Sequence, residues 1–314
     1  MWKQKNEGYE FNYNLYITKP YRKKSEIYIL IISILILFFL ILIAKQSIDM
    51  INRKIALNQY IKQANIVKEE QERIEEEKRI EEARKLEEYK NKKMPQLTDE
   101  GKENIENIYH SETKRAFLTF DDGPSSNTSE ILDILKQENV PATFFVLGNA
   151  VEKQPELVKR AYQEGHYIAN HGYSHVYSKI YSSPESVLDE YNNCNTAVQN
   201  AIENSEYDSH LFRFPGGLVG GKYAKLKEEA KDLLNENDIV NIDWNCLTGD
   251  AETRYPTEEK LMDGLIQTSN DKNSIVVLMH DAAEKTMTVE TLPKVINYLR
   301  EQGYEFKNFY EIIK

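Results

Sequence analysis

Two adjacent aspartates, Asp121 and Asp122, lie in the stretch TFDDGP directly after the apolar residues 116–118. Two carboxylates about 4 Å apart repel each other by roughly 4 kcal/mol at an effective dielectric constant near 20, so something must offset that repulsion. A divalent cation would do so, and one aspartate could then bind the metal while the other acts as a base. The alternative is an ordinary turn, in which Gly123 supplies an unusual backbone conformation and Pro124 ends the strand.

Two histidines, His171 and His175, are four positions apart in the stretch HGYSH. On a helical turn both imidazoles face the same side and can hold one cation. This spacing alone is weak evidence, because a surface histidine or a satisfied core histidine is commoner than a ligand. With a nearby carboxylate, however, the pair would form a two-histidine, one-aspartate set that leaves metal positions open for water and substrate.

The residues after position 114 predict the elements that would bring these groups together. Short apolar runs predict strands at residues 115–120, 142–147, 167–169, 211–214, 239–242 and 274–279. Amphipathic segments between them predict helices at residues 129–138, 151–164, 184–203, 223–235, 257–269 and 288–302. This alternation predicts an α/β fold with a parallel sheet, either open and doubly wound or closed into a barrel.

Polar residues end or follow five of the six predicted strands. They are Asp121 and Asp122, Asn170 and His171, Arg213 with residues 215–217, Asp243 and Trp244, and His280 and Asp281. Enzymes with parallel sheets build their sites at the carboxyl ends of the strands. The sequence therefore predicts that these distant segments meet in one site.

The stretches TFDDGP, HGYSH, RFPGG, DW and LMH occur in this order along the chain. Together they resemble the five motifs of the polysaccharide deacetylase family, the NodB-homology carbohydrate esterases. The resemblance extends over roughly residues 115–314 and leaves the N-terminal part uncovered. It implies a deformed (β/α) barrel of about seven parallel strands. It also implies one divalent metal ion, most commonly Zn²⁺, although related members use Co²⁺ or another transition metal.

The same resemblance implies how the first three motifs divide the chemistry. Asp121 is the expected general base, and the expected metal ligands are Asp122, His171 and His175. Arg213 is expected to pair with Asp121 and to keep its carboxylate ionised, as a neighbouring opposite charge does.

The last two motifs are expected to supply the acid. His280 would be the general acid, and Asp243 would hold and charge its ring. Asp250 and Asp281 also lie close enough in the sequence to compete with Asp243 for that place.

Three further residues are expected around the substrate. The backbone N–H of Gly216 would face the oxyanion, and Trp244 and Leu278 would line the pocket for the acetyl methyl group, unless both simply pack in the core. The chain departs from the family pattern at four positions: Gly172 replaces a usual Ser or Thr, Val176 a Pro, Gly216 a common Tyr, and Val240 an Asp. These departures remove no expected ligand or proton carrier, but they affect the loops and the groove that would choose the substrate.

The activity implied is metal-dependent hydrolysis of the N-acetyl group of N-acetylglucosamine residues in a cell-wall glycan, with release of acetate. Peptidoglycan is the expected substrate, and poly-N-acetylglucosamine or chitin oligomers are the alternatives. A non-catalytic glycan-binding wall protein with the same fold is a further alternative, although a degraded relative should lack a ligand or the base.

The N-terminal part predicts a membrane anchor. Residues 27–44 form an apolar run without a charge, long enough as a helix to cross a bilayer core of roughly 30 Å. A cleaved signal peptide is the alternative, but no small-x-small site follows Ala44. Four bases precede the run, at positions 19, 22, 23 and 24, and only Lys45 closely follows it. This bias predicts a single-pass cell-membrane protein with residues 1–26 in the cytoplasm and the catalytic domain outside.

Two segments would connect the anchor to that domain. Residues 45–93 are rich in charge and lack Gly and Pro, which predicts a helical stalk. Apolar residues after Val67 do not sustain a heptad, so a solvated single helix fits better than a strong coiled coil. Residues 94–113 are expected as a linker with one short helix, and residues 114–314 as the catalytic domain.

Composition narrows the expected partners. The 314-residue chain has a formal net charge of −11 and a pI near 5.2. Nucleic-acid binders usually carry a basic face, so this balance argues against nucleic acid and favours a neutral or cationic partner. Cys194 and Cys246 are too few for a disulfide framework or a cysteine metal site, while a single disulfide between them stays open.

Overall fold

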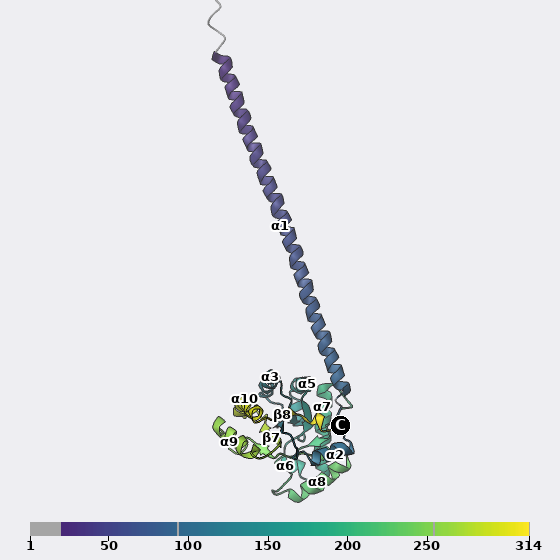
Figure 1. The fold of residues 1–314 in the computed structure, drawn as a ribbon. Helices are drawn as coiled ribbons and strands as arrows, with labels where there is room; N and C mark the ends of the chain where they lie inside the picture. The colour runs from purple at the N-terminus through teal and green to yellow at the C-terminus, as the bar shows by residue number, and fades with distance from the viewer. Residues whose placement is uncertain (1–19, 93, 254, 314) are drawn as a thin grey trace, which may run out of the picture. The chain divides into compact units, whose positions relative to one another are not determined.

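A computed structural model describes residues 20–92, 94–253 and 255–313 of the chain (Figure 1). Most of the predicted cytoplasmic segment 1–26, including Lys19, lies outside the described residues. The chain divides into two compact units, residues 1–82 and 83–314. Each unit is described by itself.

Helix α1 runs from Pro20 to Lys92 without a break (Figure 1). Proline is tolerated in the first turn, where its missing N–H has no intrahelical partner, and no Gly or Pro follows it within the helix. Apolar side chains from Ile27 to Ile43 are exposed on every face of this helix. Among the described residues, this is the one helix long and apolar enough to cross a membrane.

The second unit is built on a parallel sheet in the order β5-β4-β3-β2-β1-β7-β6, with β8 beside the first half of β1. The strands are β1 Arg115–Asp121, β2 Thr143–Val146, β3 Tyr167–Asn170, β4 Leu211–Phe212, β5 Val240–Asn241, β6 Cys246–Leu247, β7 Ser274–His280 and β8 Glu305–Lys307. In the described part of the chain β5 and β6 end the sheet and do not pair with each other. The seven strands of this order therefore form a curled half-barrel, which confirms the predicted deformed barrel.

Successive side chains along β1 face opposite sides of the sheet. Ala116, Leu118 and Phe120 pack in the outer core cluster, whereas Phe117 packs in the inner one. The same alternation places Thr119 and Asp121 on the inner side. Because the sheet curls around this inner side, Asp121 at the end of β1 faces the ends of the other strands.

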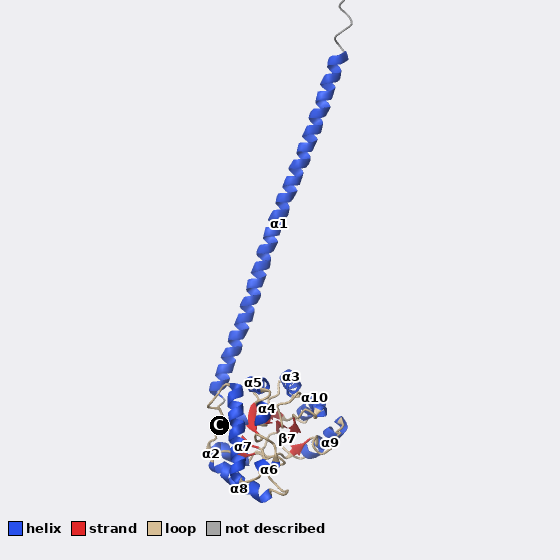
Figure 2. Ribbon diagram, turned by 180° about the vertical axis from the view of Figure 1, so that it is seen from behind, coloured by secondary structure: helices blue, strands red, loops and turns tan. Residues whose placement is uncertain are grey.

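Helices cover the outer face of the sheet (Figure 2). Two elements lie instead on the inner side, α2 Asp99–Glu106 and a 3₁₀ turn at Phe309–Glu311. The other helices are α3 Thr128–Glu138, α4 Gly148–Val151, α5 Pro155–Gln163, α6 Tyr177–Ile180, α7 Pro184–Ile202, α8 Ala224–Glu236, α9 Glu258–Ser269 and α10 Thr286–Glu301. The single helix predicted at residues 151–164 is two helices, because Pro155 starts a new one at its first position.

Helix α2 fills the inner side of the half-barrel together with the chain end. Ile105 and Ile108 are buried in the same cluster as Phe309 and Ile313, and Figures 1 and 2 both show the C-terminus beside α2. Residues 94–113 thus contain one short helix, α2, which packs on the folded unit. The two isoleucines of this segment are core residues, and the folded unit begins before residue 114.

The two cysteines are both free and buried. Cys194 lies in α7 and its thiol donates to the carbonyl of Val146 at 3.3 Å. Cys246 lies in β6 and contacts the hydroxyl of Thr268 at 3.3 Å. The disulfide that the sequence left open is not formed.

Candidate active site

A buried ion pair joins the end of β1 to the end of β4. Asp121 Oδ1 accepts a hydrogen bond from Arg213 Nη1 at 2.8 Å, and the Arg213 side chain is fully buried. The other groups that accept from this guanidinium are the Thr119 hydroxyl and the carbonyls of Ile242 and Asp243. Burial raises the pKa of Asp121, and the charge of Arg213 opposes that rise. Asp121 is therefore an oriented carboxylate whose basicity is greater than that of a solvated one.

Asp122, His171 and His175 converge beside this pair. Nε2 of His171 lies 3.5 Å from Asp122 Oδ1, and Nε2 of His175 lies 3.4 Å from the same oxygen. This oxygen is buried and has no hydrogen-bond partner among the described residues. An unpaired buried carboxylate oxygen is costly, and a cation between the three groups would satisfy it. The set thus fits a divalent metal with two imidazoles, one carboxylate and open positions.

The backbone at two of these residues is unusual. Asp122 has φ of 73° and His175 has φ of 55°, in the left-handed region that few non-glycine residues adopt. Such strain persists where the surrounding structure imposes it, and it concentrates at functional sites. Here it lets adjacent Asp121 and Asp122 point into different parts of one site.

His171 is held in the orientation that a ligand needs. Its Nδ1 donates to the carbonyl of Arg213 at 2.8 Å, which leaves Nε2 free to face Asp122. Burial lowers the pKa of His171 to about 3. The ring is therefore neutral at physiological pH, as metal binding requires.

Glu190 holds the loop between the two histidines, and its role was not predicted from the sequence. Its Oε2 accepts from the backbone N–H groups of Tyr173 and Ser174, both at 2.6 Å, and its Oε1 accepts from the Ser174 hydroxyl at 2.6 Å. A Cβ at Gly172, where φ is 90°, would lie 3.4 Å from Oε2. That distance is an ordinary contact, so the positive φ, and not a lack of space, is what favours glycine at position 172.

We expect Glu190→Gln to weaken metal binding. The amide nitrogen would face backbone donors in place of a carboxylate oxygen, so the loop with His171 and His175 would lose its fixed geometry. Loss of such an outer contact lowers metal affinity by roughly 10- to 100-fold. Competition with a chromogenic chelator measures it, with the neighbouring exposed Asp189→Asn as the matched control. Equal affinities in the two variants would contradict this role.

The partner of His280 differs from the expected one. Asp250 Oδ1 accepts from His280 Nδ1 at 2.8 Å, and Asp250 Oδ2 accepts from the backbone N–H of His280 at 2.8 Å. Asp243 instead accepts from the backbone N–H of Leu218 at 3.0 Å. Asp281 accepts from the hydroxyl of Thr128 at 2.6 Å.

The prediction that Asp243 holds His280 is therefore wrong, and strand order explains why. Asp250 follows β6, which pairs directly with β7 and so lies next to His280. Asp243 follows β5, at the opposite end of the sheet order. Its carboxylate anchors the loop that carries Gly216.

The residues expected as acid and base lie opposite each other on neighbouring strands. Asp121 of β1 is in register with His280 of β7. Burial alone would lower the pKa of His280, but the hydrogen bond and charge of Asp250 outweigh it and raise that pKa. Asp121 Oδ2 also lies 3.9 Å from His171 Nε2. One small region thus holds a buried carboxylate, a proton donor and a candidate metal site.

The three residues expected around the substrate occupy positions compatible with that expectation. Gly216 is exposed, with φ of 75°, and its N–H has no partner within the described parts of the chain. The Trp244 ring lies over Gly217, 3.1 Å from where a Cβ would stand. Leu278 is 8% exposed and lies on β7 two residues before His280, so both face the inner side. Their contacts with an acetyl group stay predictions.

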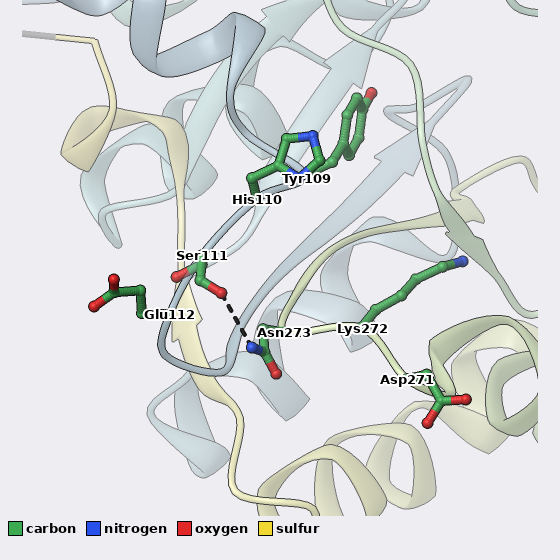
Figure 3. Close-up of a pocket in the computed structure, with 7 residues that line it drawn as sticks. All are labelled: Tyr109, His110, Ser111, Glu112, Asp271, Lys272 and Asn273. Atoms are coloured by element: carbon green, nitrogen blue, oxygen red, sulfur yellow. Dashed lines mark hydrogen bonds between the residues drawn. The ribbon is translucent and has the colours of Figure 1, made fainter.

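A separate cleft of about 550 Å³ lies at the other end of the strands (Figure 3). It is lined by residues 109–112 and 271–273, immediately before β1 and β7 begin. The Asn273 amide donates to the carbonyl of Ser111 at 3.1 Å across it. The residues described above follow the carboxyl ends of these strands, so this cleft is not part of their site.

Comparison with known proteins agrees with this geometry. A family model described as polysaccharide deacetylase matches residues 109–233. A peptidoglycan-N-acetylglucosamine deacetylase of Bacillus cereus is 34% identical over 205 residues, which cover 64% of this chain and 71% of that protein. The chain belongs to the polysaccharide deacetylase family.

Solved structures of this family share the fold. A Streptococcus mutans CE4 esterase superposes with a TM-score of 0.60 at 32% identity, covering 68% of this chain and 92% of that one. The catalytic domain of a peptidoglycan N-acetylglucosamine deacetylase from Eubacterium rectale gives a TM-score of 0.58 at 29% identity, covering 63% and 90%. Family membership supports hydrolytic deacetylation of a glycan as the activity of this polysaccharide deacetylase.

Proposed function

We propose that this polysaccharide deacetylase is a membrane-anchored, metal-dependent enzyme that removes the acetyl group from N-acetylglucosamine residues of peptidoglycan. The observation that carries the proposal is the convergence of Asp122, His171 and His175 beside the Asp121–Arg213 pair and His280. Each group needed for amide hydrolysis is present within one set of strand ends. A glycan-binding protein without activity would have no need of an oriented base and acid.

The three ligands would hold the metal ion, with Zn²⁺ as the first candidate from their donor set. Such an ion, when bound, lowers the pKa of water and polarises a carbonyl oxygen. Asp121 would take the proton of the attacking water, because its Oδ2 faces the ligands while Arg213 holds Oδ1.

His280 would complete the reaction from the opposite strand. Asp250 holds its Nδ1, so Nε2 is free to donate a proton to the amide nitrogen as the carbon–nitrogen bond breaks. The free N–H of Gly216 would face the carbonyl oxygen as charge develops there. Water oxygen ends on the acyl carbon, and the products are acetate and a glucosaminyl amine.

We propose peptidoglycan as the substrate because of the relatives and the anchor. The Bacillus cereus relative bears that substrate in its name, and α1 carries a candidate membrane span. Arg22, Lys23 and Lys24 before the apolar run favour a cytoplasmic N-terminus and an outward-facing enzyme. A tethered deacetylase would act on a polymer close to the membrane.

Acetate release from purified peptidoglycan and from chitin oligomers tests this proposal, with the full chain in detergent micelles. We expect acetate from peptidoglycan, and none after chelation of metal. Turnover of the oligomers without release from peptidoglycan would refute the wall assignment. No release from either substrate by metal-loaded protein would favour a non-catalytic glycan-binding function.

We expect the pH profile to depend on Asp250. His280 donates only when protonated, so kcat should fall as pH rises through its raised pKa. Asp250→Asn removes the charge that raises this pKa, and the alkaline limb of the profile should therefore move to lower pH. Asp243→Asn, whose carboxylate contacts Leu218 and not His280, should leave the limb in place even if it lowers the rate. A limb that moves with Asp243→Asn instead would contradict the assigned pairing.

A further inference from the structure

Tyr177 lies at the rim of the candidate metal site, at the first position of α6. Its ring contacts the His175 ring edge-on at a centroid distance of 5.7 Å and the Tyr181 ring at 5.6 Å. Tyr181 is buried, and its hydroxyl donates to the carbonyl of Pro215 at 2.7 Å. The Tyr177 ring is therefore held between a metal-ligand candidate and a fixed buried ring.

The hydroxyl of Tyr177 lies directly over Gly216. A Cβ built at Gly216 would stand only 2.6 Å from the Tyr177 Oη and 3.4 Å from its Cζ. Any larger residue at position 216 would therefore displace this hydroxyl. The Tyr177 hydroxyl can occupy this position because Gly216 has no side chain.

Both groups at this point are unpaired donors. Neither the Tyr177 hydroxyl nor the Gly216 N–H has a hydrogen-bond partner within the described ranges 20–92, 94–253 and 255–313. Tyr177 is 40% exposed and Gly216 is exposed, so a substrate can reach them. A phenol O–H and a backbone N–H side by side suit an oxygen that gains negative charge.

We propose that Tyr177 is a catalytic residue whose hydroxyl donates a hydrogen bond to the acetamide oxygen in the transition state, beside the N–H of Gly216. This inference rests on the proposed deacetylase function. The Tyr177 proton stays on its oxygen throughout, so the role is charge stabilisation and not proton transfer. Rigid placement by His175 and Tyr181 means that little reorganisation is needed as the charge develops.

Tyr177→Phe tests this role, because it removes the hydroxyl and keeps the ring contacts. Loss of one such donor typically lowers kcat by about 10²- to 10³-fold, and for a partly exposed tyrosine we expect a loss of at least roughly 10-fold. The Michaelis constant, the metal affinity and the thermal unfolding midpoint should stay close to those of the parent protein. Tyr298→Phe on α10, near the other end of the strands, is the matched control and should leave kcat unchanged.

Steady-state kinetics of acetate release from purified peptidoglycan and chelator competition with Zn²⁺ supply the two readouts. An unchanged kcat, or a change confined to the Michaelis constant, would overturn the inference, since either result would place Tyr177 in ground-state binding or in packing alone. A fall in kcat accompanied by an equal loss of metal affinity would overturn it as well. Failure of the parent protein to release acetate would instead refute the proposed function.

Discussion

Asp121→Asn is expected to lower the rate of acetate release by about 10²- to 10⁴-fold, the usual contribution of a positioned general base. The amide has nearly the shape of the carboxylate but cannot accept the water proton. The three candidate ligands are Asp122, His171 and His175. Asp121 is not among them, so metal affinity should change little. Added metal should therefore not restore activity.

Metal analysis and single-turnover assays on this variant separate chemistry from binding. Arg213 would face a neutral amide in the variant, so the free energy of unfolding must be measured in parallel to confirm that the fold is intact. Full activity in Asp121→Asn would contradict the assignment of the base. So would recovery of activity at high metal concentration.

Asp122→Asn is expected to give the opposite result at the adjacent residue. Asn tolerates the left-handed backbone at this position, where φ is 73°, so the substitution removes the charge without adding strain. We expect metal affinity to fall by more than about 100-fold, the upper end of the loss for an outer contact. Activity should be low at stoichiometric metal and should rise with excess metal.

The pair of variants is a matched experiment, because the same chemical change is made at neighbouring positions. Chelator competition and acetate release at several metal concentrations distinguish them. Identical behaviour of the two variants would refute the division of labour between Asp121 and Asp122. If the Asp122→Asn variant still binds metal tightly, the Asp122 carboxylate is not a principal ligand.

The longer strands and their ends could be predicted from the sequence because they are continuous apolar runs. The runs for β1 and β7 end at Asp121 and His280, and their parallel register brings these two residues together. Placement at strand ends, combined with the order of the motifs, was sufficient to predict that Asp121, His280 and the three ligand candidates lie in one site. Local pattern and tertiary structure agree at these positions.

The contacts that were not predicted leave no local pattern in the sequence. Strand β6 has two residues, Cys246–Leu247, too few to show a period, and without it the sequence could not place Asp250 next to His280. Glu190 lies in an amphipathic helix and looks like any exposed acid until the fold brings it to the histidine loop. Tyr177 likewise meets Gly216 only through tertiary packing.

Titration of metal-free protein with Zn²⁺ while acetate release from purified peptidoglycan is recorded tests the central claim most directly. The account predicts no release from the metal-free protein and a rise that saturates at one ion per chain. Acetate release should saturate at the Zn²⁺ concentration that fills a single tight metal site, as measured by chelator competition. Full release from protein that holds no metal, or a rise with no tight site, would contradict it.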